Sequence, residues 1–157
     1  MTDTLREVIT TYPESLAARE AAELLRRQDQ DPPSLTVVAE PRRLWPPDHM
    51  LIAISVNVAA ADAVDPSPRI TLVSIECNDA FAGAPPAAGD RGANQTTCDA
   101  EDVAGAEYGT DDRAFELRAE RRGDGPGRTY AITYSATDAA GNTATAQTAV
   151  TVSHDQR

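Results

Sequence analysis

Lysine is missing from this sequence. All 14 basic residues are arginine, and they stand against 25 acidic residues, which leaves a formal net charge of −11. So acidic a surface argues against nucleic acid as a partner, because neutralising phosphates requires a basic surface. It is compatible with solubility and with cation binding. The exclusive use of arginine, together with the many alanines, indicates a bacterial genome of high GC content.

Long hydrophobic runs are also missing. None approaches the roughly 20 apolar residues needed to cross a bilayer, and residues 1–10 lack the apolar centre of a signal peptide. We therefore expect no membrane insertion. A cytoplasmic protein, a fragment of a longer secreted protein and a secreted chain whose leader has been removed all stay open. The β-domain features described below favour the last two, so we expect a secreted or cell-surface location.

Side chains suited to catalysis are scarce. The two histidines, His49 and His154, lie at the outer ends of the predicted strands, without a nucleophile and an orienting group to complete a catalytic set. The sequence has no Gly-x-Ser-x-Gly motif and no glycine-rich phosphate loop before a helix. The histidines and cysteines also lack zinc-ligand spacing. We therefore predict that the chain is not an enzyme.

The sequence has only two cysteines, Cys77 and Cys98. They form a disulfide if the compartment is oxidising and the geometry allows it. Two free thiols are the alternative that the sequence leaves open.

The first 30 residues predict a helical extension. Apolar residues recur at helical spacing between Thr4 and Gln28, and Pro13 should kink or split this stretch. Residues 29–33 contain two adjacent prolines and read as a linker. We therefore divide the chain into a helical extension at 1–30 and a β-domain at 31–157.

From Ser34 onward the hydrophobic period changes from 3.6 to 2. In the clearest segment, Ile52 to Val58, branched apolar residues alternate with alanine, serine and asparagine, as in a strand with one buried face. Further segments separated by turn signals bring the total to about seven short strands, which suggests a β-sandwich. The predicted core includes Val37, Ile52, Ile54, Val56, Leu72, Phe115, Leu117, Ile132, Tyr134 and Val150.

Residues 78–109 fit this pattern poorly. The stretch is rich in alanine, glycine, proline and aspartate, and an insert of this length is unusual inside a compact domain. We expect a poorly patterned edge strand near Glu107 and Tyr108. A disulfide would then attach the insert to the strand that ends at Cys77.

Three motifs resemble a known group of domains. Leu44-Trp-Pro-Pro-Asp-His49 precedes a strand, Tyr130-Ala-Ile-Thr-Tyr134 forms one, and Ala136-Thr-Asp-Ala-Ala-Gly-Asn142 follows it. Residues 33–155 are similar to the bacterial Ig-like repeat modules of secreted and surface proteins, related to the HYR and fibronectin type III-like groups. The resemblance implies an immunoglobulin-like β-sandwich that serves as a spacer, adhesion element or accessory domain. The long insert and the helical extension depart from such modules.

Two aromatic residues have expected structural roles. Tyr130 lies early in the penultimate strand, where a tyrosine-corner hydroxyl can bond a nearby backbone group; a plain core aromatic is the alternative. Trp45 is flanked by proline, and we expect it to close one end of the core. A ligand-stacking role for Trp45 is the less favoured reading.

Acidic turn residues should gather at the linker end of the sandwich, because alternate loops meet at the same end. A hard cation with oxygen ligands, Ca²⁺, would relieve their mutual repulsion and stiffen the linker. Solvated turn aspartates are the plainer alternative, since aspartate is a normal turn residue. The candidate ligands are Asp29, Asp31, Asp62, Asp65, Asp111, Asp112, Asp138 and Asn142.

The expected function is therefore a non-catalytic extracellular module, with other domains of the same polypeptide or a cell-surface protein as partners. The alternative is a carbohydrate- or protein-binding accessory module of a larger secreted enzyme. Aromatic residues make up only 4% of the chain, and Trp45 and Tyr108 are the plausible sugar-stacking side chains. That scarcity favours the spacer or adhesion role.

Overall fold

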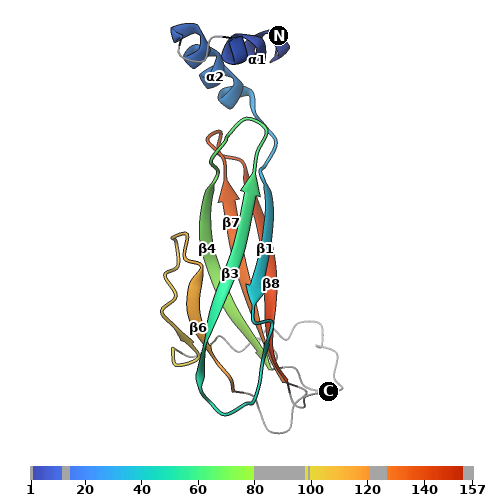
Figure 1. Cartoon of the computed structure of the whole chain (residues 1–157), viewed down its shortest axis with the longest axis vertical. Coiled ribbons are helices and arrows are strands. Elements are labelled where there is room, and N and C mark those ends of the chain that lie inside the picture. The colour runs from blue at the N-terminus through green and yellow to red at the C-terminus, as the bar shows by residue number, and fades with distance from the viewer. Residues whose placement is uncertain (1, 12–14, 80–97, 99, 121–126, 154–157) are drawn as a thin grey trace, which may run out of the picture.

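The computed structural model describes residues 2–11, 15–79, 98, 100–120 and 127–153. The molecule is elongated, with two helices at one end and two β-sheets packed face to face along the rest of its length (Figure 1). The helices are α1 (Thr2–Thr11) and α2 (Leu16–Gln28). The break predicted near Pro13 falls between them, in residues that lie outside the described part of the chain.

The start of α2 is fixed by a local cap. The Oγ atom of Ser15 accepts a 3.0 Å hydrogen bond from the backbone N–H of Ala18, which satisfies one of the free donors of the first turn. The last turn carries Arg26 and Arg27, where positive charge suits the helix dipole. Three small or apolar residues of α2 are buried: Ala18, Ala21 and Leu25.

The first sheet is antiparallel throughout and has the order β1-β3-β6-β5. Its strands are β1 (Ser34–Glu40), β3 (Leu51–Ala61), β6 (Ala114–Arg118) and β5 (Val103–Ala104). The second sheet has the order β2-β8-β7-β4, and its β2–β8 pair is parallel. Its strands are β2 (Arg43–Leu44), β8 (Thr143–Ser153), β7 (Gly127–Thr137) and β4 (Arg69–Asp79).

The described residues contain eight strands, against about seven predicted from the sequence. The two shortest, β2 and β5, have two residues each and carry no alternation that a sequence pattern could reveal. The edge strand expected near Glu107 and Tyr108 lies earlier in the chain, at β5, and Tyr108 sits in a turn. That part of the expectation was wrong.

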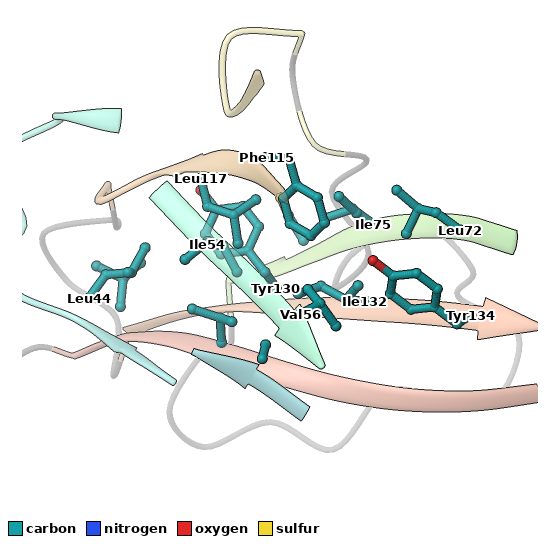
Figure 2. Close-up of a cluster of buried hydrophobic side chains, with 14 of the residues drawn as sticks. Leu44, Ile54, Val56, Leu72, Ile75, Phe115, Leu117, Tyr130, Ile132 and Tyr134 are labelled. Atoms are coloured by element: carbon teal, nitrogen blue, oxygen red, sulfur yellow. The ribbon is translucent and has the colours of Figure 1, made fainter. Parts of the chain in front are cut away.

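The core lies between the two sheets (Figure 2). In the middle of β3 and along β7 from Tyr130 to Ala136, every second side chain is buried, as the alternating pattern predicts. Most of the predicted core is confirmed: Ile54, Val56, Leu72, Phe115, Leu117, Ile132, Tyr134 and Val150 are all buried. Val37 and Ile52 are partly buried and pack against this cluster.

The two aromatic residues singled out in the sequence have different environments. Tyr130 is fully buried, and its hydroxyl donates a 2.7 Å hydrogen bond to the carbonyl of Arg118 at the end of β6. Trp45 does not fill the core: it is 40% exposed, and its neighbour Leu44 is buried instead. Pairing of β2 with β8 points Leu44 inward, so the next side chain is directed outward.

The disulfide between Cys77 and Cys98 is present, with 5.1 Å between the two Cα atoms. It attaches the insert, at Cys98, to β4. Asp102 is a buried residue that the sequence analysis missed. It forms an ion pair with Arg128 on β7, with 2.9 Å between Oδ1 of Asp102 and Nη1 of Arg128. No sequence pattern distinguishes Asp102 from its acidic neighbours, so only the folded arrangement reveals this contact.

Candidate metal site at the linker

Three connecting segments meet where the helices join the sheets (Figure 1). They are the linker after α2, the β3–β4 connection and the β7–β8 turn. Each contributes an aspartate, and carboxylate oxygens of Asp29, Asp62 and Asp138 all lie within 4.8 Å of one another. The fold therefore brings together residues that are far apart in the sequence.

Asp138 organises the β7–β8 turn. Its Oδ1 accepts hydrogen bonds from the backbone N–H groups of Ala140 (2.8 Å) and Asn142 (2.9 Å). Gly141 adopts a φ of 95°, a conformation that a side chain would oppose. This is a local reason for aspartate and glycine at these positions, independent of any ligand.

Asp62 and Asp65 shape the β3–β4 connection. The Oδ1 of Asp62 accepts hydrogen bonds from the backbone N–H groups of Val64 (2.8 Å) and Asp65 (2.6 Å). Asp65 in turn accepts a 2.9 Å bond from the backbone N–H of Ala139, and this contact ties the connection to the β7–β8 turn. Asp65 is thus a brace between the two loops.

The linker is joined to the same turn through Asn142. Its Nδ2 donates to the backbone carbonyl of Asp29 (3.2 Å) and to Oδ2 of Asp138 (2.8 Å). The Oδ1 of Asp29 accepts a 3.1 Å bond from the backbone N–H of Asp31, whose own side chain is not in the group of three carboxylates. These bonds position Asp29 beside the sheets.

Asp111 and Asp112 are not part of this group. Asp111 forms an ion pair with Arg113, with 2.8 Å between Oδ1 and Nε. Asp112 accepts hydrogen bonds from the backbone N–H groups of Glu107 (2.8 Å) and Ala114 (3.1 Å). The eight candidate ligands therefore comprise three clustered carboxylates, two side chains that brace the loops around them (Asp65 and Asn142), Asp31, whose backbone N–H bonds Asp29, and two residues with other partners.

The arrangement suits a hard cation. Carboxylate and carbonyl oxygens are the ligands that Ca²⁺ and Mg²⁺ prefer, and Ca²⁺ tolerates irregular geometry. In the cluster each hydrogen-bonded aspartate retains lone pairs, because a carboxylate offers about four acceptor positions. The plainer interpretation also has support, since every one of the three carboxylates accepts a backbone N–H bond within its own segment.

Asp138 has a lowered pKa. The side chain is 6% exposed, and desolvation alone would raise the pKa of the carboxyl group. Hydrogen bonds from the side chain and backbone of Asn142, and from the backbone N–H groups of Ala140 and Gly141, outweigh this effect. They hold the pKa below its ordinary value of 3.8. The charged carboxylate is therefore the form that the turn stabilises.

Acid should remove this contribution. A folded-state pKa below the unfolded value means that the unfolded chain binds the proton first, so the stabilisation is present above about pH 4 and is lost as the pH falls through the folded pKa. We expect the wild-type protein to lose more stability between about pH 5 and pH 2 than Asp138→Asn loses, in urea unfolding followed across that range. Because Asp138→Asn also disturbs the bond from Asn142, the comparison concerns the slope with pH. Equal slopes would contradict a role for the ionised carboxylate.

Comparison of the chain with protein-family models, with curated proteins and with solved structures finds no significant match. Neither of the two described helices is long and apolar enough to cross a membrane.

Proposed function

We propose that this chain is a non-catalytic structural or interaction module that acts outside the cytoplasm as a spacer or adhesion domain. In this proposal the β-domain is immunoglobulin-like, and a Ca²⁺ ion held by Asp29, Asp62 and Asp138 fixes the helical extension to it. The observation that carries the proposal is the convergence of these carboxylates from the linker and from two loops of the sheets.

The strand order supports an immunoglobulin-like module. Immunoglobulin domains of the constant type have strands A, B, E and D in one sheet and C, F and G in the other. If β1 and β2 are both counted as strand A, the orders β1-β3-β6-β5 and β2-β8-β7-β4 follow that scheme strand for strand. The hydroxyl of Tyr130, early in the penultimate strand, bonds the backbone of the preceding strand as a tyrosine corner does.

The disulfide supports the extracellular location. Disulfides persist in oxidising compartments and are rare in the reducing cytosol. Cys77 is 3% exposed and belongs to the core, so its bond to Cys98 is part of the packed structure. Acidity fits the same role, since a surface of net charge −11 stays soluble and attracts divalent cations.

Calcium would strengthen the junction between the helical extension and the β-domain. A hydrogen bond joins the linker to the β7–β8 turn, from the side chain of Asn142 to the carbonyl of Asp29. A cation bound by carboxylates of all three segments would add charge-assisted links at the place where the helical extension meets the β-domain. The helical extension would then keep a fixed orientation relative to the β-domain.

Calcium should therefore raise the stability of the protein. Extracellular calcium sites have dissociation constants of about 0.1–1 mM, so about 10 mM Ca²⁺ should raise the free energy of unfolding by about 1–3 kcal/mol. Thermal unfolding in Ca²⁺ and in EDTA measures this shift. Asp62→Asn should abolish the shift while it retains an oxygen acceptor for the turn. Asp111→Asn, which removes the same charge outside the cluster, should leave it unchanged.

Isothermal titration calorimetry gives an independent measurement. We expect heat of binding from the wild-type protein and from Asp111→Asn, and none from Asp62→Asn. The absence of both heat and a thermal shift in the wild-type protein would rule out the calcium site and leave the three carboxylates as ordinary turn caps.

A further inference from the structure

A short segment links the two sheets across one edge of the sandwich. We call it the β5 strap: it consists of Cys98 and residues 100–104, and it contains β5. Figure 1 shows this part of the chain in yellow beside β6. Cys98 is bonded to Cys77 on β4, in the second sheet, whereas β5 pairs with β6, in the first. The strap is therefore attached to one sheet by a covalent bond and to the other by strand pairing.

Asp102 joins the strap to both sheets through charge. Its Oδ1 lies 2.9 Å from Nη1 of Arg128 on β7 and 3.9 Å from Nε of Arg118 on β6. Its backbone carbonyl accepts a 2.9 Å hydrogen bond from the N–H of Arg118, and Nε of the same arginine donates to the carbonyl of Glu101 at 2.9 Å. Asp102 is 6% exposed. Docking of the strap therefore buries a carboxylate between guanidinium groups from the two sheets.

The docking contacts contribute little net free energy. Taking a carboxylate and a guanidinium out of water costs nearly as much as their attraction returns. The backbone hydrogen bonds replace bonds to water, so their net gain is small. β5 contributes two residue pairs, Val103 with Leu117 and Ala104 with Glu116, and the side chain of Val103 is only partly buried. A pairing this short is marginal unless another link holds it in place.

The disulfide is that further link. Cys98 shortly precedes Asp102, so its bond to Cys77 keeps the carboxylate near both arginines even when the strap separates from β6. Redocking is then an intramolecular step, with the high effective concentration that a short tether gives. In the chain-entropy model, closing a loop of 21 positions corresponds to a factor of about 100 in an equilibrium constant.

We propose that the β5 strap is a redox-controlled latch. With the disulfide formed, Asp102 is held between Arg118 and Arg128; with the disulfide reduced, the strap leaves β6 while both sheets stay folded. A dithiol reduces the bond by attacking one sulfur and then closing its own disulfide, so two electrons and two protons pass to the cysteines. Opening frees the backbone groups at this edge of β6. The inference goes beyond the proposed function, because it requires neither calcium nor a partner domain.

Two neighbouring amides test the latch by hydrogen exchange. The N–H of Arg118 donates to Asp102 in the strap, whereas the N–H of Ala119 donates to the carbonyl of Met50 at 2.8 Å, outside the strap. After reduction of the wild-type protein with dithiothreitol, the protection of the Arg118 amide should fall about 100-fold, to well below that of Ala119. Its exchange should be insensitive to low urea concentrations, because a local opening exposes little surface. Exchange at Ala119 should follow unfolding of the whole domain.

The variant Cys98→Ser removes the bond without a reductant and leaves Cys77 in the core. It should reproduce the exchange pattern of the reduced protein, with circular dichroism showing that the sheets are retained. Equal protection and equal urea dependence of the two amides after complete reduction would overturn the latch, since the bond would then support only the domain as a whole. Loss of the sheets on reduction would overturn it as well.

Asp102→Asn tests whether the buried charge belongs to the latch. In the oxidised protein the variant should lower the protection of the Arg118 amide about tenfold, because the carboxylate that both arginines share is gone. In the reduced protein the strap is already open, so the same change should have little further effect. Glu101→Gln removes an equal charge from the exposed neighbouring side chain and should change neither redox state. An equal effect of Asp102→Asn in both states would mean that the strap stays docked without the disulfide, and would contradict the proposal.

Discussion

Reduction of the Cys77–Cys98 disulfide is expected to lower the free energy of unfolding by about 3 kcal/mol. The two cysteines are separated by 21 positions, and opening a loop of that size gives the unfolded chain more conformational freedom. The bond links β4 to the segment that leads into β5. Urea unfolding with and without dithiothreitol measures the difference in a chain whose composition is unchanged.

A double variant separates the bond from the reductant. Cys77→Ser/Cys98→Ser cannot form the disulfide, so dithiothreitol should not change its stability. Because Cys77 is 3% exposed, the double variant is expected to be somewhat less stable than the reduced wild type, since its serine places a hydroxyl in the core. Equal stability of the oxidised and reduced wild-type proteins would contradict a structural role for the bond.

Alternation in the sequence was sufficient to locate the long strands and their inward faces. In β3 the buried residues Ile54, Val56 and Val58 occupy every second position, as a strand with one face on the core requires. The same reasoning failed for the pair Leu44 and Trp45. Hydrophobicity favours tryptophan for the core, but the register of a two-residue strand decides which side chain points inward, and so short a strand has no periodic signal.

The site could be predicted only in part, because it depends on how the loops stack. The linker and the two turns with Asp62 and Asp138 do meet, as the sandwich arrangement suggested. The segment before Asp111 runs elsewhere: the N–H of Gly109 donates to the carbonyl of Leu72, and the N–H of Leu72 donates to the carbonyl of Thr110. This segment is therefore tied to the side of β4, within the strand and away from its end. The spacing of the aspartates in the sequence does not indicate that the segment before Asp111 follows this path.

The inward face of β6 offers the sharpest test of the packing. Leu117 is fully buried, and it lies opposite Ile52 on β3 and Val103 on β5. Leu117→Ala should lower the free energy of unfolding by about 2–5 kcal/mol, because the lost apolar contacts leave a cavity that the sheets can only partly fill. Chemical denaturation monitored by circular dichroism measures the change.

Glu116 provides the matched control on the same strand. It is the preceding residue, its side chain is exposed, and it lies opposite Ala53 on β3. Glu116→Ala should change stability by no more than about 0.5 kcal/mol. A register shifted by one residue would reverse the two effects, because every side chain of β6 would then point to the other face. A larger loss from Glu116→Ala than from Leu117→Ala would therefore contradict both the strand register and the core that depends on it.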